Sequence, residues 1–143
     1  MLISTKGRYA LRILVDMAEH QTENYITLQE VSQRQGISEK YLESIVRELV
    51  KKGVVAGQRG KGGGYRLCAR PEEINVGDVL RGMEGSLAPV ACLTEGATPC
   101  QRASACRTLE FWRGLNEVIG RYTAGYTIAD MMRTGQAGDD YII

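Results

Sequence analysis

The sequence has no apolar run long enough to cross a membrane, and residues 1–6 lack the hydrophobic core of a secretory signal. It also shows no internal repeat and no low-complexity block. Hydrophobic residues make up 43% of the 143-residue chain, which suffices for a core and argues against global disorder. We therefore expect a cytoplasmic protein without a membrane partner. Its length predicts one domain, with or without an added oligomerisation element.

Residues that would support catalysis are scarce as well. The single histidine, His20, lies far along the sequence from the clustered cysteines, and no Cys-x-x-Cys pair is present. A thiol–disulfide or metal-dependent enzyme is disfavoured, because no evident base or redox pair accompanies the thiols. We therefore expect a protein that is not an enzyme.

The net charge of +1 is unevenly distributed. Residues 1–70 carry a net charge of +5, whereas residues 71–143 carry −4. The first half is therefore the better candidate for contact with a polyanion such as DNA.

A helix-turn-helix pattern lies within this basic half. The capping box Thr27-x-x-Glu30 opens a short helix, and Gly36 is a natural left-handed cap at its end. Ser38 then caps a second helix over residues 39–52, which is placed to enter a major groove. A plain helical hairpin in a core would give a similar pattern, so the residues that follow decide the interpretation.

Two short strand candidates, 54–56 and 65–67, flank a glycine-rich tip that carries Arg59 and Lys61. This pattern is typical of the wing of a winged helix, where small residues allow close approach and a cation reaches a phosphate or the minor groove. A phosphate-binding loop is excluded, because a strand follows the glycines and no Ser or Thr follows Lys61.

The predicted fold is mainly α-helical with a small β-hairpin wing. A helix over 108–123 carries an apolar stripe that includes the only Trp and the only Phe; it could close a monomer core, but operators are commonly two-fold and favour its use in a homodimer. The predicted organisation is a winged helix-turn-helix DNA-binding domain over 1–84, a cysteine-bearing loop over 85–107, a dimerisation helix and C-terminal turn over 108–132, and a flexible tail over 133–143.

The loop holds Cys92, Cys100 and Cys106 within fifteen residues. Soft thiolates suit an iron–sulfur cluster or zinc, but structural zinc sites usually show closely spaced cysteine pairs and four protein ligands. An iron–sulfur cluster tolerates the wider spacing, and a thiol switch that forms a disulfide on oxidation is the alternative. A fourth cysteine, Cys68, is predicted to be a small buried hydrophobic residue.

The chain closely resembles the IscR-like iron–sulfur cluster regulators of the bacterial Rrf family of winged-helix proteins. The resemblance rests on residues 4–11, 35–43, 59–65, 76–79 and 108–112 together with the three cysteines, and it spans residues 1–132. It implies a homodimeric transcription factor that binds a double-stranded DNA operator. Many members hold an iron–sulfur cluster on these cysteines, and others lack the cysteines and respond to partner proteins.

Two positions depart from the family pattern at the expected fourth ligand. Leu109 stands where the best-known members have a histidine, and Arg8 stands near the position where other relatives supply a carboxylate. The candidates that remain are Glu95, Glu110, a residue of the partner subunit, or an exogenous thiol or water. Among cluster types we prefer 2Fe–2S to 4Fe–4S.

The residues predicted to contact DNA are Lys6, Arg8, Ser38, Lys40, Tyr41, Glu43, Ser44, Arg59 and Lys61. The cations of the first helix are expected to bind phosphate, and Arg59 to enter the minor groove. Glu43 is expected to select sites by accepting from cytosine, although a solvated helix position would look the same.

The leading hypothesis is thus a DNA-binding regulator that senses an iron–sulfur cluster and controls cluster biogenesis or a related iron or redox response. The alternative is a clusterless regulator of cysteine or sulfur metabolism that acts by a thiol switch or through a partner protein.

Overall fold

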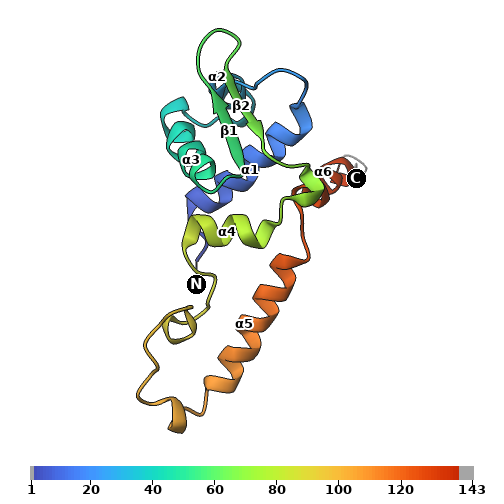
Figure 1. The fold of residues 1–143 in the computed structure, drawn as a ribbon. Coiled ribbons are helices and arrows are strands. Elements are labelled where there is room, and N and C mark those ends of the chain that lie inside the picture. The colour runs from blue at the N-terminus through green and yellow to red at the C-terminus, as the bar shows by residue number, and fades with distance from the viewer. Residues whose placement is uncertain (1, 139–143) are drawn as a thin grey trace.

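The computed structural model describes residues 2–138, and Figure 1 shows a helical body from which one long helix projects. Helix α1 (Thr5–His20) begins where the Ser4 hydroxyl accepts a hydrogen bond from the Gly7 N–H at 3.2 Å. The apolar side chains on one side of α1 are buried in the core: Ala10, Ile13, Leu14, Met17 and Ala18. No helix within residues 2–138 is both long and apolar enough to cross a membrane.

The helix-turn-helix consists of α2 (Leu28–Gln35) and α3 (Glu39–Lys51). The predicted capping box is present, because the Glu30 carboxylate accepts from the Thr27 N–H at 2.7 Å and the Thr27 hydroxyl accepts from the Glu30 N–H at 3.2 Å. Gly36 ends α2 in the left-handed conformation, with φ of 66°. The turn is therefore set by the residues that the sequence indicated.

The wing is an antiparallel pair of strands, β1 (Val55–Gln58) and β2 (Gly64–Leu67). Tyr65 also exchanges two backbone hydrogen bonds of 2.8 Å with Ile26, in the segment before α2. This bridge requires glycine at position 64, because a Cβ there would lie 2.5 Å from the Ile26 carbonyl oxygen. The wing is thus fastened through β2 to the segment that precedes the helix-turn-helix.

The second half of the chain leaves the body and returns to it. Helix α4 (Val76–Glu84) packs on α1, and the segment after it leads away from the body. Helix α5 (Leu109–Ala124) runs back from the far end toward the body, where α6 (Ile128–Gly138) packs against α1 (Figure 1). The short 3-10 turns η1 (Pro71–Glu73), η2 (Ala91–Leu93) and η3 (Ala103–Ala105) complete the described elements. Ile128 of α6 is completely buried.

The start of α1 is joined to the end of α4. The Glu84 carboxylate accepts from both the backbone N–H of Ser4, at 3.1 Å, and the Ser4 hydroxyl, at 2.7 Å. Gly7 makes room for this contact, since a Cβ there would lie 2.2 Å from the Glu84 oxygen. The residue that precedes the cysteine-bearing segment is therefore held against the first helix.

One carboxylate is buried inside the helical body. Asp16 of α1 is 1% exposed, and its two oxygens accept from the guanidinium of Arg34 at 2.7 to 3.2 Å and from the Gln35 amide at 2.9 Å. A buried charge needs such a partner to offset its lost hydration. The ion pair therefore holds α2 in place against α1.

Two sequence predictions differ from the structure. Cys68 is exposed, because it follows the last residue of β2, where the chain leaves the sheet and turns toward η1. Helix α6 continues to Gly138, past residue 133 at which the flexible tail was predicted to begin, so residues 133–138 are helical. Residues 139–143 of the predicted tail lie outside the described residues.

Candidate functional site

The helix α3 and the wing border a common groove. Its walls are formed by Glu43 and Arg47 of α3 and by Gln58, Arg59 and Tyr65 of the wing. Two elements that are separate in the sequence thus face the same space, as a winged helix requires for contact with one stretch of DNA.

The residues predicted to contact DNA are accessible to solvent, and Glu43 and Arg59 among them line the groove. All of them are exposed except Lys6, which is half-buried. Two of their hydroxyls have local roles: that of Ser38 accepts from the Tyr41 N–H at 3.3 Å and caps α3, and that of Ser44 donates to the Tyr41 carbonyl at 2.8 Å. The first turn of α3 is therefore ordered before any ligand arrives.

Glu43 has a partner that the sequence analysis did not name. The Arg47 guanidinium donates to the Glu43 carboxylate at 3.0 Å, and both side chains are more than half exposed. An exposed i,i+4 pair contributes only about 0.3–0.5 kcal/mol, so DNA can replace it at little cost. The four-residue spacing was the signal that could have identified Arg47.

Aromatic and cationic contacts fix the orientation of α3 on α1. The Tyr9 and Tyr41 rings meet edge to face with centroids 5.7 Å apart, and the Arg12 guanidinium lies 5.0 Å from the Tyr9 centroid. Arg12 also donates to the Gln35 carbonyl at 2.6 Å, at the end of α2. Tyr9 therefore packs against the exposed Tyr41, and Arg12 connects Tyr9 to the end of α2.

The cysteine-bearing segment lies outside the core. From residue 88 to residue 127 no side chain is buried, and this stretch includes both the loop and the whole of α5. Cys92 and Cys100 are exposed, and Cys106 is half-buried. The thiols are thus accessible to metal, oxidant or a partner molecule.

Hydrogen-bond donors surround the Cys106 thiol. The Thr108 hydroxyl lies 3.4 Å from its Sγ and, together with the backbone N–H groups of Thr108 and Leu109, lowers the pKa of the Cys106 thiol below its ordinary value. These groups lie at the start of α5, where helix N–H groups favour a negative charge. A thiolate is the form that binds metal.

The donor set fits an iron–sulfur cluster in its chemistry but is not assembled in one chain. Three accessible thiols in one loop are suitable soft ligands. Within residues 2–138, however, no three Cys, His, Asp or Glu side chains lie close enough together to hold a metal ion. Of the two acidic candidates for a fourth ligand, Glu110 is paired with Arg113 at 2.8 Å.

Helix α5 presents apolar side chains to solvent. Phe111 and Tyr122 are each 65% exposed and Val118 is 50% exposed. On one side of the helix, Val118, Ile119 and Tyr122 line an apolar hollow with Ile3 and Leu80 of the body. Exposed apolar surface of this extent marks a contact site.

A family model described as an iron-dependent transcriptional regulator, Rrf2, matches residues 3–134. The chain belongs to the Rrf2 family. It is a DNA-binding transcription regulator with the winged-helix fold of that family, and its relatives are regulators rather than enzymes.

Curated Rrf2-family relatives match most of the chain. The protein rrf2 of Nitratidesulfovibrio vulgaris is 39% identical over 133 residues, covering 93% of this chain and 88% of the relative. The regulator IscR of Aliivibrio salmonicida is also 39% identical, over 132 residues that cover 92% of this chain and 77% of IscR.

Solved structures of Rrf2-family regulators have the same fold. CymR, the global cysteine regulator of B. subtilis, superposes with a TM-score of 0.76 at 34% identity, covering 94% of this chain and 98% of CymR. IscR of T. potens superposes with a TM-score of 0.73 at 31% identity, covering 100% of this chain and 93% of that protein.

Proposed function

We propose that this Rrf2-family regulator senses an iron–sulfur cluster through Cys92, Cys100 and Cys106 and controls cluster biogenesis or a related iron or redox response. The observation that carries the proposal is that three accessible thiols lie in the loop that connects α4 of the DNA-binding body to the far end of the projecting helix α5 (Figure 1). The similarity to IscR supports it. When bound, the cluster would supply iron sites whose redox state and occupancy respond to the cell.

The loop must close for the three thiols to act together. No residue from 88 to 107 is buried, so closure breaks no core packing. The lowered pKa of the Cys106 thiol favours its thiolate, the form that binds metal. Glu95, Glu110, the partner subunit or an exogenous ligand would complete the site, with 2Fe–2S preferred.

The DNA interface is formed by α3, the wing and the start of α1. Ser38, Lys40, Tyr41, Glu43 and Ser44 would face the major groove, Arg59 and Lys61 the adjacent minor groove, and Lys6 and Arg8 the phosphates. Glu43 would exchange its ion pair with Arg47 for a cytosine amino group, and sites without that group would leave the carboxylate unpaired. A regulator that binds a chromosomal operator would act in the cytoplasm.

The exposed stripe of α5 supports a homodimer. Phe111, Val118 and Tyr122 would be covered by the α5 of a second subunit. Two recognition helices would then be presented to a two-fold operator. In this proposal residues 1–84 form the DNA-binding domain, residues 85–107 the cysteine-bearing loop, and residues 108–132 the dimerisation helix with its C-terminal turn.

Anaerobic purification tests the cluster directly. Iron, acid-labile sulfide and visible absorption are measured for the wild type and for Cys92→Ala, Cys100→Ala and Cys106→Ala. Cys68→Ala is the matched control, because Cys68 is equally exposed but lies outside the loop. Iron and sulfide that are lost in the three loop variants and kept in the control support the proposal. Wild-type protein without iron, or with zinc and no sulfide, rejects it.

A clusterless regulator of cysteine or sulfur metabolism is the second candidate. The similarity to CymR favours it, and so does the lack of convergence of the thiols in a single chain. In that case the thiols would act as an oxidation switch or a partner protein would carry the signal. Preserved DNA regulation in a variant without all three loop cysteines would favour a partner protein.

A further inference from the structure

A second candidate site lies behind the recognition helix, away from the cysteines. It is a cavity of about 320 Å³ between the end of α3, the start of β1, η1 and α4. Ligand pockets typically enclose about 300–1,000 Å³, so this cavity suits a small molecule and is too small for a nucleotide cofactor. None of the residues assigned to DNA or to a cluster lines it.

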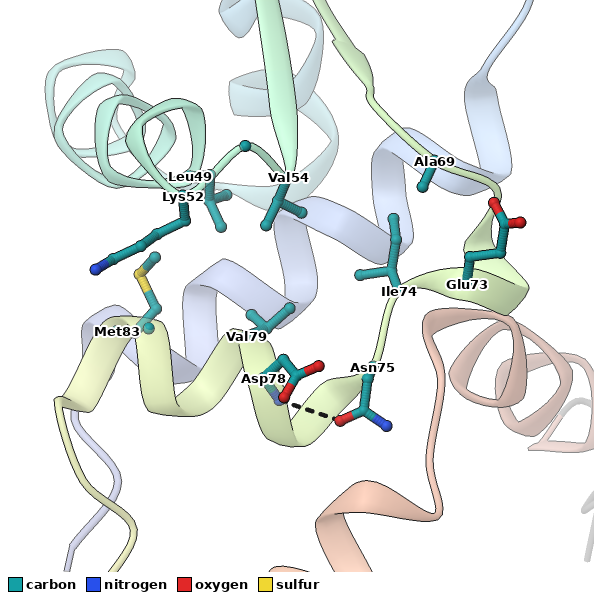
Figure 2. A pocket seen from close by; sticks show the side chains of 12 residues that line it. Leu49, Lys52, Val54, Ala69, Glu73, Ile74, Asn75, Asp78, Val79 and Met83 are labelled. Carbon is teal, nitrogen blue, oxygen red and sulfur yellow. Dashed lines mark hydrogen bonds between the residues drawn. The ribbon is translucent and has the colours of Figure 1, made fainter. Parts of the chain in front are cut away.

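The floor of the cavity is aliphatic. Leu49, Val54, Ile74 and Val79 lie in its middle, as Figure 2 shows, and Leu49 and Val79 are buried core residues. The floor would therefore bind hydrocarbon, whose transfer from water is favourable at about 25 cal/mol per Å².

The charges at the two ends of the cavity differ in what they already contact. At one end Glu73 uses both carboxylate oxygens on Arg70, and Asp78 is paired with Arg81 at 3.1 Å. At the other end lies Lys52, next to Met83 (Figure 2). Among the described residues Lys52 forms no salt bridge, whereas its neighbour Lys51 is paired with Glu48 at 3.3 Å. Lys52 is therefore the available charge.

Gly82 keeps the space beside Lys52 open. A Cβ at this position would lie 3.6 to 3.8 Å from the Cγ, Cδ and Cε atoms of Lys52. The lysine stem thus lies along the glycine face of α4. Figure 2 shows its ammonium pointing outward, away from Val54, Ile74 and Val79, at the end of the cavity beside Met83.

We propose that this cavity binds a small aliphatic carboxylate, with the carboxylate on the Lys52 ammonium and the hydrocarbon on the floor of Leu49, Ile74 and Val79. The occupant would contact α3 and α4 together, and so join the recognition helix to the helix that leads into the cysteine loop. This site is independent of the proposed cluster.

The test is a titration of ¹⁵N-labelled full-length protein, without DNA or iron, followed by amide chemical shifts. The probe is 4-methylpentanoate, and the matched probes are 4-methylpentan-1-ol, which lacks the charge, and 3-methylbutylamine, which reverses it. We expect 4-methylpentanoate to shift the Gly53, Gly82 and Met83 amides and to bind about tenfold or more tightly than either matched probe.

Variants locate the site. Lys52→Met keeps the apolar stem and is expected to weaken 4-methylpentanoate about tenfold or more, while Lys51→Met leaves the affinity unchanged. Gly82→Leu fills the cavity and abolishes binding, whereas Gly82→Ala retains it. The proposal is overturned if the three amides do not move in the wild type, if the amine or the alcohol binds as tightly as the acid, or if Lys51→Met and Lys52→Met weaken binding equally.

Discussion

The buried ion pair between Asp16 and Arg34 leads to a prediction with an unusual sign. Arg34→Met removes the guanidinium from a carboxylate that is 1% exposed, so Asp16 keeps the hydrogen bond from the Gln35 amide and the His20 Nδ1 at 3.9 Å but loses its guanidinium partner. Leaving one member of a buried pair without its partner typically costs about 3–5 kcal/mol of unfolding free energy. For a chain of this size that corresponds to a fall in Tm of roughly 6–20 °C.

Adding Asp16→Leu to Arg34→Met is expected to restore most of that loss. The double variant has no charge left in the core, and replacing a whole buried pair by apolar residues is often neutral or stabilising. The two substitutions are therefore strongly non-additive, as expected for residues in direct contact.

Urea unfolding followed by circular dichroism measures the effect. The control is Arg70→Met, which removes an arginine from a surface pair whose side chains are 77% and 53% exposed and should change stability by less than about 1 kcal/mol. The reasoning attributes the loss in Arg34→Met to the unpaired charge of Asp16. A double variant that is less stable than Arg34→Met alone would refute it, because removing that charge would then have brought no gain.

Three further predictions follow from other contacts. Gly64→Ala should destabilise the protein by about 1–3 kcal/mol or more in urea unfolding, because its Cβ would strike the Ile26 carbonyl. Gly62→Ala has open space around it and should cost about 1 kcal/mol. Equal losses in the two variants would contradict this account. Lys6→Ala and Arg8→Ala should each reduce the magnitude of the slope of log affinity for DNA against log salt by about 0.9, because each removes one proposed phosphate contact, while Arg113→Ala on α5 leaves it unchanged, as fluorescence anisotropy can show. The Thr27 N–H, followed by the Thr27 hydroxyl, lowers the pKa of Glu30, so the Glu30 cap stabilises the folded state above the ordinary glutamate pKa of about 4.3, and its contribution is lost as the pH falls through the lowered value. The stability deficit of Glu30→Gln relative to the wild type should thus be larger at pH 7 than at pH 3 in urea unfolding, and a deficit independent of pH would argue against the cap.

Local chemistry explains which parts of the fold could be predicted. Ser4, Thr27 and Ser38 cap their helices because a side-chain oxygen reaches an N–H three residues ahead, and that information lies within a few residues of sequence. The same local logic predicted α4 over 76–84, and the structure confirms Val76–Glu84.

Long-range contacts account for what the sequence did not reveal. The backbone bridge between Ile26 and Tyr65 depends on how the wing folds back, and no side-chain pattern encodes it. Asp16 lies on the stripe of α1 as one polar residue among apolar ones, and its partner Arg34 is on another helix. Cys68 was wrongly assigned to the interior because its apolar character does not indicate where the chain leaves the sheet.

The fourth ligand of the proposed cluster and the proposed closure of the cysteine loop could not be predicted from the sequence for a related reason. They depend on how the three thiols meet, and within residues 2–138 a single chain does not bring them together. Residue types indicate which metal chemistry is suitable, but the distances among ligands arise only from tertiary or quaternary packing.

The joint between Ser4 and Glu84 has a mechanical consequence. Glu84 is the last residue of α4, and the chain beyond it runs into the cysteine loop. Any pull on the loop that displaces Glu84 must either break both hydrogen bonds to Ser4 or drag the start of α1 along, and Lys6 and Arg8 lie within its first turn. A displacement of Glu84 would thus reach Lys6 and Arg8, the residues proposed to bind phosphate, through the Glu84 carboxylate as well as through the packing of α4 on α1.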